Sequence, residues 1–291
     1  MKRISKFFVI ALTTLISVQT MPFVDTVVCN TNSTEYWGVI VVSLAETLHP
    51  YVYDALIQAN NWDEDHIRLL WKQDASRENI FDALSWVQSR SDENDVVLFS
   101  VDCHGVYIGG DYGIWPSDGD SNGFVTIDEL ESAFDKITAE GICLIFDCCF
   151  SGTFVEPSQF CSKNTVSGAR FKEKVISGLN ADNRVVIMGT MPNGLGVHWI
   201  DVDPLTGEQT VDISPSSVVA NGLIEGNDMN DDGITSAEEA YLYLKENFRR
   251  YALKGFLNIP LQMFCYLAYG FFTLPFPTIS DNYDGEMPLV E

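Results

Sequence analysis

The sequence predicts an α/β protein, a three-layer αβα sandwich in which a mostly parallel β-sheet lies between two layers of helices. Two observations predict this fold. Short apolar runs rich in β-branched residues alternate with helical segments along the chain, which is typical of parallel strands joined by helical crossovers. The apolar runs are also nearly continuous, as expected of strands that are covered on both faces.

Five segments are expected to form strands: 37–43, 67–71, 95–101, 141–147 and 184–189. Four segments are expected to form helices: 52–60, 78–89, 126–137 and 236–251. The third helix should begin at Thr126, because Glu129 follows three residues later and completes a capping-box spacing. In sheets of this kind, functional sites form at the carboxyl ends of the strands.

Composition and charge restrict the classes of partner. A chain of 291 residues with 46% apolar and 20% charged residues is typical of a globular domain with a sizeable core. The formal net charge of −24 excludes nucleic acid as an expected partner, because the phosphate backbone repels such a chain. The seven cysteines include no C-x-x-C pair and fit no zinc pattern.

Residues 1–28 are predicted to form a signal peptide or an uncleaved N-terminal anchor. Three cations at positions 2, 3 and 6 precede a short apolar run at 7–18. Asp25 interrupts any extension of that run to a length that would span a membrane. We therefore expect a secreted protein or one on the extracellular surface, with no other membrane attachment and a single domain over 36–291.

Two short motifs follow expected strands. One is Asp102-Cys103-His104-Gly105, and the other is Asp147-Cys148-Cys149-Phe150-Ser151-Gly152. A cysteine attacks a peptide carbonyl as thiolate, and a neighbouring imidazole can accept its proton and pass it to the leaving amine. Because adjacent side chains on a strand point in opposite directions, only one of Cys148 and Cys149 can face His104.

These motifs resemble the caspase-like superfamily of cysteine peptidases, which includes metacaspases, legumains and clostripain-like enzymes. Members carry His-Gly after one strand and D-x-C-x-S-G, or a relative of it, after the next. The resemblance covers roughly 36–290, includes the helix start at 77–80, and is greatest to prokaryotic metacaspase-like proteins. Two departures are Asp102-Cys103, where Ser-Gly is usual, and Phe150, where metacaspases often have His.

The resemblance implies a cysteine endopeptidase with a caspase-like sheet, acting on protein or peptide substrates. Cys149 would be the nucleophile and His104 its acid/base partner. The backbone N–H groups of Gly105 and Cys149 would form the oxyanion hole. Asp147 would line a pocket for Arg or Lys of the substrate, with an Asp that only caps a backbone turn as the alternative. Asn193 is a weaker candidate for the same pocket. One alternative inside the enzyme class is a legumain-like preference for Asn or Asp.

The segment 152–180 is a candidate site of self-cleavage. It carries four of the 17 basic residues, namely Lys163, Arg170, Lys172 and Lys174. A peptidase that accepts basic residues could cut its own zymogen there, and cleavage would complete the site. An ordinary exposed loop would account for the composition equally well.

Two acidic segments, 118–129 and 228–239, fit the twelve-residue EF-hand loop. Oxygen-bearing residues stand at positions 1, 3, 5, 9 and 12, glycine stands at position 6, and position 7 supplies a carbonyl. The predicted Ca²⁺ ligands are Asp118, Asp120, Asn122, Phe124 and Glu129 in the first loop and Asp228, Asn230, Asp232, Ile234 and Glu239 in the second.

Acidic turns that bind no metal are the alternative for each loop. For the whole chain, the alternative outside the enzyme class is a non-catalytic Ca²⁺-binding surface protein built on the same scaffold.

Overall fold

The computed structural model describes residues 33–44, 48–119, 123–155, 179–190, 196, 199–202, 209–255 and 276–291. The chain divides into two compact units, Met1–Thr31 and Asn32–Glu291, and the described residues all belong to the second. The predicted leader at 1–28 lies outside the described residues, as does most of the segment 152–180.

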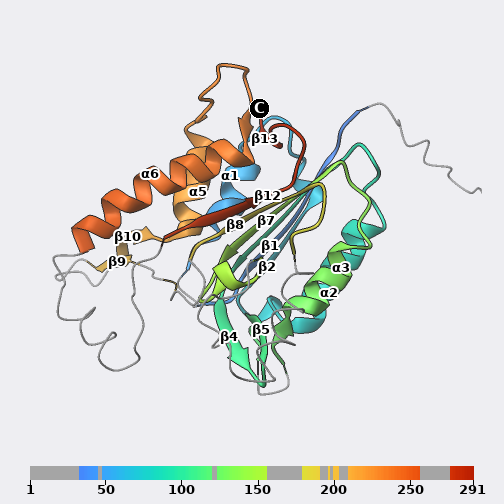
Figure 1. The fold of residues 1–291 in the computed structure, drawn as a ribbon, viewed down its shortest axis with the longest axis vertical. Coiled ribbons are helices and arrows are strands. Elements are labelled where there is room, and N and C mark those ends of the chain that lie inside the picture. The colour runs from blue at the N-terminus through green and yellow to red at the C-terminus, as the bar shows by residue number, and fades with distance from the viewer. Residues whose placement is uncertain are drawn as a thin grey trace, which may run out of the picture. The chain divides into compact units, whose positions relative to one another are not determined.

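A six-stranded sheet forms the centre of the second unit (Figure 1). Five of its strands are parallel to one another, and the edge strand β12 is antiparallel to β8. The order across the sheet is β12 (Thr278–Asp281), β8 (Arg184–Met188), β7 (Gly141–Asp147), β3 (Val96–Asp102), β1 (Tyr36–Val42) and β2 (Ile67–Trp71). The five parallel strands are the five predicted from the sequence.

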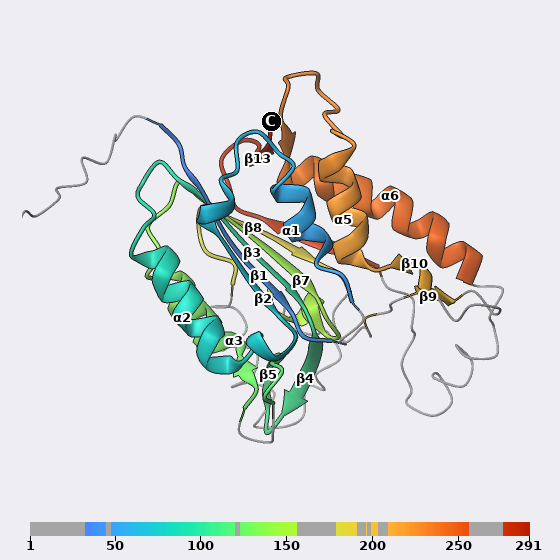
Figure 2. The ribbon, with the colours of Figure 1, turned by 180° about the vertical axis from the view of Figure 1, so that it is seen from behind.

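Helices cover both faces of this sheet, which confirms the predicted αβα sandwich (Figures 1 and 2). One face carries α2 (Arg77–Gln88) and α3 (Ile127–Phe134), and the other carries α1 (Tyr51–Leu56), α5 (Pro215–Ile224) and α6 (Ala237–Gly255). Along β3, Val97 and Phe99 pack toward α3, whereas Leu98 packs on the opposite face. None of the described helices has the length and apolarity needed to cross a membrane.

Side-chain caps define where the helices begin. The Ser76 hydroxyl accepts a hydrogen bond from the Asn79 N–H at the start of α2. The capping box of Thr126 and Glu129 predicted for α3 is confirmed. The sequence did not predict α5, which buries eight of its ten residues and therefore lacks a clear polar face.

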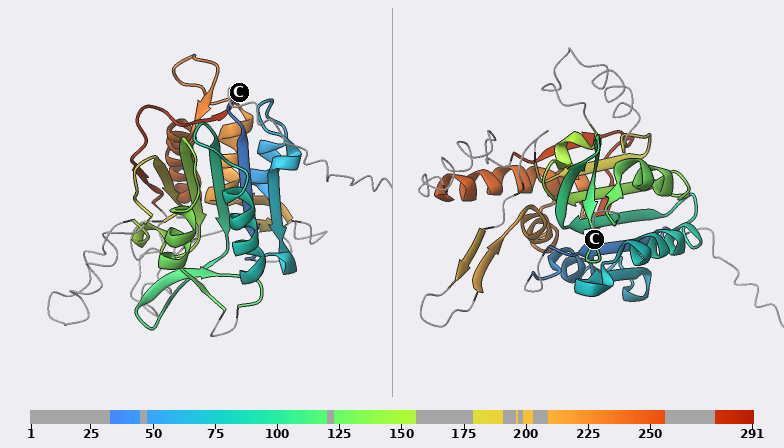
Figure 3. Two further views of the ribbon diagram at one scale, coloured as in Figure 1. Left: turned by 90° about the vertical axis from the view of Figure 1, so that its right-hand side faces the viewer. Right: turned by 90° about the horizontal axis from the view of Figure 1, so that it is seen from below.

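A small antiparallel sheet lies beyond the carboxyl ends of β3 and β7 (Figures 1 and 3). It consists of β4 (His104–Ile108), β5 (Asp111–Trp115) and β6 (Val125–Thr126), in that order. Two further pairs are β9 (Trp199–Val202) with β10 (Gln209–Ile213) and β11 (Thr235–Ser236) with β13 (Pro288–Val290). Short 3₁₀ turns occupy η1 (Glu64–His66), η2 (Lys72–Asp74) and η3 (Ser151–Thr153).

Candidate active site

The register of the central strands brings the two predicted motifs to one edge of the sheet. Asp102 at the end of β3 is the direct Cα partner of Asp147 at the end of β7. His104 and Cys149 each follow two residues later. Because β3 and β7 are parallel neighbours, both residues lie at the same carboxyl edge.

The backbone of Gly105 lies directly against Cys149. A Cβ atom built on Gly105 would lie 1.8 Å from the carbonyl oxygen of Cys149 and 2.7 Å from its carbonyl carbon. Only glycine permits so close an approach of two backbones. Gly105 and Cys149 are therefore in direct contact. They are the two residues that the sequence analysis expects to share one oxyanion hole.

Two backbone donors face the thiol of Cys149. The Gly196 N–H donates to its Sγ at 3.3 Å, and the Gly105 N–H also donates to this sulfur. Burial raises the pKa of the Cys149 thiol above its ordinary value, while these two N–H groups oppose that shift. Peptide cleavage at neutral pH would therefore require a base to remove the thiol proton.

His104 begins β4 on the exposed side of that strand and is the Cα partner of Trp115 on β5. Without substrate, catalytic hydrogen bonds are often long and tighten only in the reacting complex. The position of His104 at the edge shared with Cys149 keeps it the candidate base.

The two adjacent cysteines differ in access to solvent. Cys148 is only 2% exposed and packs in the core on the face of the sheet that α2 and α3 cover. Burial raises its pKa well above the ordinary value. Cys149 is only partly buried. Of the pair, Cys149 is the more accessible thiol.

Asp147 is buried at the end of β7, with only 1% of its surface exposed. Its Oδ2 accepts a hydrogen bond of 2.8 Å from the Ser216 N–H in the first turn of α5. A helix N-terminus favours a negative charge, so α5 stabilises the carboxylate beside the thiol. Asn193, the other predicted pocket residue, lies outside the described residues.

In the first predicted calcium loop, Asp118, Phe124 and Glu129 are described, whereas Asp120 and Asn122 are not. The carbonyl of Phe124 and the carboxylate of Glu129 both accept hydrogen bonds from the guanidinium of Arg77.

The second loop, 228–239, adopts a tight turn in which acidic side chains accept from backbone N–H groups. Asp228 accepts from Asp232 and Gly233 at 3.1 and 2.7 Å, and Gly233 at position 6 has a φ of +89°. The Asp232 carboxylate accepts from the N–H of Ile234 at 2.9 Å and from the Asn230 side chain at 3.1 Å.

Glu239 at position 12 accepts from the N–H groups of Met229 and Ser236. The oxygen donors are of the type that Ca²⁺ prefers, and the glycine suits the turn. Among the described residues, no three His, Cys, Asp or Glu side chains are gathered closely enough to hold a metal ion.

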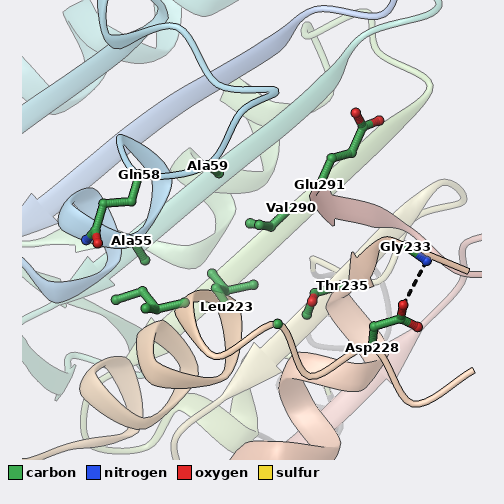
Figure 4. Close-up of a pocket in the computed structure, with 11 residues that line it drawn as sticks. Ala55, Gln58, Ala59, Leu223, Asp228, Gly233, Thr235, Val290 and Glu291 are labelled. Carbon is green, nitrogen blue, oxygen red and sulfur yellow. Dashed lines mark hydrogen bonds between the residues drawn. The ribbon is translucent and has the colours of Figure 1, made fainter. Parts of the chain in front are cut away.

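A pocket of about 410 Å³ borders this second loop (Figure 4). Its walls come from α1, α5, the loop and β13, and include Ala55, Leu223, Asp228 and Val290. Neither Cys149 nor His104 is among the residues that line it, so this pocket is separate from the candidate active site.

Sequence reasoning missed Gly196 and Ser216 as neighbours of the site. Gly196 follows the last residue of β8 by eight positions, and Ser216 lies in α5, which the sequence did not predict. Another missed contact joins Ser151 to Thr190: the Thr190 N–H donates to the Ser151 hydroxyl at 3.1 Å and links the loops after β7 and β8. Only the sheet order brings these residues together, and no local motif encodes it.

Comparison with known proteins agrees with this geometry. Residues 43–158 match the family model of the metacaspase, peptidase C14 domain, and this range contains both His104 and Cys149. The predicted relationship to the caspase-like superfamily is confirmed. The match supports a cysteine peptidase built on a caspase-like α/β sandwich.

No curated protein matches the chain. Among solved structures, the chain is similar to the crystal structure of protein GSU0716 from Geobacter sulfurreducens. The two share 15% sequence identity with a TM-score of 0.45, over 73% of this chain and 89% of the other. So distant a likeness says nothing about activity.

Proposed function

We propose that this caspase-like protein is an endopeptidase that cleaves after Arg or Lys, with Cys149 as nucleophile and His104 as acid/base. The strongest support for this proposal is the environment of the Cys149 sulfur. A partly exposed thiol with N–H donors from Gly105 and Gly196, at the edge that also carries His104, has the parts that acyl transfer requires.

The reaction would proceed in two steps. His104 accepts the proton of the Cys149 thiol as the sulfur attacks the scissile carbonyl carbon. The resulting oxyanion accepts hydrogen bonds from the N–H groups of Gly105 and Cys149, which together would form a preorganised oxyanion hole. His104 then gives the proton to the leaving amine, and water, deprotonated by the same imidazole, hydrolyses the thioester.

Substrate preference would come from Asp147. Its carboxylate lies two residues before the nucleophile and is held by the Ser216 N–H. A buried carboxylate close to the thiol attracts a cationic side chain and disfavours an acidic one. Basic P1 residues are the best match, and the self-cleavage proposed for 152–180 would use its Lys and Arg residues.

Export and calcium complete the proposal. The N-terminal segment 1–28 would direct the chain out of the cytoplasm and into surroundings in which Ca²⁺ is plentiful. In loop 228–239, Asp228, Asn230, Asp232, Ile234 and Glu239 would hold Ca²⁺, which would neutralise the acidic turn beside α6.

Fluorogenic peptides that end in Arg, Lys, Asn or Asp test the proposal directly. We expect hydrolysis of the Arg and Lys peptides by the wild type, in the presence of Ca²⁺, and none by Cys149→Ala. Cys148→Ala is the matched control, because it removes the adjacent buried thiol, and it should retain activity.

Preference for Asn or Asp peptides would instead support a legumain-like enzyme. Absence of hydrolysis of every peptide, by protein that binds Ca²⁺, would support the non-catalytic alternative. Self-cleavage is tested in the same preparation: Cys149→Ala should remain uncut in 152–180.

A further inference from the structure

The acidic loop 118–129 already has a cationic partner from the same chain, the guanidinium of Arg77. Arg77 is the first residue of α2, and its Nη1 donates to the Phe124 carbonyl at 2.9 Å and to Glu129 Oε2 at 3.1 Å. Its Nη2 donates to Glu129 Oε1 at 2.5 Å. The Arg77 backbone N–H donates to Asp118 Oδ1 at 2.9 Å. One residue therefore engages three of the five predicted calcium ligands.

These acceptors are the ones that an EF-hand loop offers to its ion. Asp118 stands at position 1, Phe124 supplies the position 7 carbonyl, and Glu129 is the position 12 carboxylate that binds through both oxygens. The planar guanidinium matches a carboxylate in the same two-oxygen manner.

Glu129 has further donors besides Arg77. Its Oε2 also accepts from the backbone N–H and the hydroxyl of Thr126, both at 3.0 Å. The Arg77 guanidinium and the Glu129 carboxylate form an ion pair through two hydrogen bonds. The carboxylate has no need of a metal ion to balance its charge.

The Arg77 contacts also reach the sheet that carries His104. Phe124 directly precedes β6, which pairs with β5 through Ile114 and Val125. Strand β5 in turn pairs with β4 through Trp115 and His104. The guanidinium thus connects the start of α2 to the strand on which His104 stands.

The second loop differs at the equivalent carboxylate. Glu239 accepts from the backbone N–H groups of Met229 and Ser236, rather than from a guanidinium. The two loops therefore share a sequence pattern but differ in what neutralises the residue at position 12.

We propose that Arg77 takes the place of Ca²⁺ in loop 118–129 and thereby positions the β4–β6 sheet, with His104, without metal. This replaces the expectation that both loops bind Ca²⁺. The positioning of His104 rests on the proposed peptidase function, whereas the exclusion of metal does not.

Metal binding is best tested in Asp228→Asn protein, which removes the position 1 ligand of the second loop. The probe is Tb³⁺, because Trp115 borders the first loop and can sensitise its luminescence: a Cβ on Gly119 would lie 2.1 Å from Trp115 Nε1. Ca²⁺ calorimetry on the same samples gives the stoichiometry.

We expect no Ca²⁺ and no sensitised Tb³⁺ signal in Asp228→Asn alone. Adding Arg77→Gln should create one site, because the freed oxygens become available. Adding Arg77→Lys instead should create none, since the ammonium keeps the charge in place. Metal at loop 118–129 while Arg77 is present, or its absence in the Arg77→Gln protein, would overturn the proposal.

The positioning role is tested by peptide hydrolysis without Ca²⁺ in otherwise unaltered protein. Arg77→Gln should lower kcat by about tenfold, since a misplaced catalytic group is costly, and Ca²⁺ should restore it through the newly opened site. Loss without rescue by Ca²⁺ would contradict the positioning role. If wild type shows no peptidase activity, the proposed function fails, while the metal titrations still decide the occupancy of loop 118–129.

Discussion

Replacing Gly105 with alanine tests the contact on which the active-site assignment depends. The added Cβ would lie 1.8 Å from the Cys149 carbonyl oxygen, whereas real Cβ contacts essentially never fall below 3.0 Å. The two backbones must therefore separate by at least about 1.2 Å. A misplacement of about 1 Å in a catalytic constellation costs roughly 100-fold in rate, or about 2.7 kcal/mol of transition-state stabilisation.

We therefore expect Gly105→Ala to lower kcat/KM for an Arg peptide by at least about 100-fold. The assay is steady-state hydrolysis, with thermal unfolding measured on the same samples. Gly109→Ala is the matched control in the β4–β5 turn. Gly109 has a φ of +67° and no atom within 4 Å of the added Cβ, so the change costs about 1–2 kcal/mol of stability and leaves kcat/KM unchanged. A Gly105→Ala enzyme as active as Gly109→Ala would refute the contact.

Three further outcomes are expected. Since burial raises the pKa of Cys149, its alkylation by iodoacetamide should have a pH midpoint above the ~8.5 of a free thiol. A midpoint below neutrality would show that burial does not dominate the pKa of this thiol. Asp147→Asn keeps an acceptor for the Ser216 N–H but loses the charge, so kcat/KM should fall roughly 10- to 100-fold for Arg peptides and little for peptides with a neutral P1 residue; an equal loss on both would indicate a structural role. Ca²⁺ at about 100 times its Kd should stabilise wild type against unfolding by about 2.7 kcal/mol, measured as a rise in Tm. Asp228→Asn should abolish this rise in Tm. A rise that persists in Asp228→Asn would exclude loop 228–239 as the Ca²⁺ site.

The central layer of the fold could be predicted because its strands carry a strong local signal. Runs such as β1 and β3 are buried at every position, and a continuous apolar run is what burial on both faces demands. The alternation of strands with helices then predicted a parallel sheet. The two motifs were expected at the carboxyl ends of its strands.

The strands that complete the site carried no such signal. Strand β4 is mostly exposed or half-buried, and β6 has only two residues, so neither shows apolar periodicity. The antiparallel β12 depends on pairing with β8, almost 100 residues earlier in the chain. Contacts set by long-range pairing leave no local pattern.

The same distinction holds for the site residues. Cys149, His104 and Gly105 belong to compact motifs and could be named from the sequence. Gly196 and the Arg77 contacts with Glu129 depend on the packing of distant segments. The EF-hand pattern at 118–129 singled out Asp118, Phe124 and Glu129 as oxygen acceptors. It could not reveal that an arginine 41 residues before Asp118 donates hydrogen bonds to all three.

Covalent labelling gives the most direct measurement of the central claim that Cys149 is the nucleophile. The wild-type protein is treated with an acyloxymethyl ketone that carries Arg at P1, and the modified residue is identified by peptide mass spectrometry. We predict one adduct per chain, on Cys149, formed at least about 100-fold more slowly in His104→Ala. An adduct on Cys148 or Cys103, or equal labelling rates with and without His104, would contradict it.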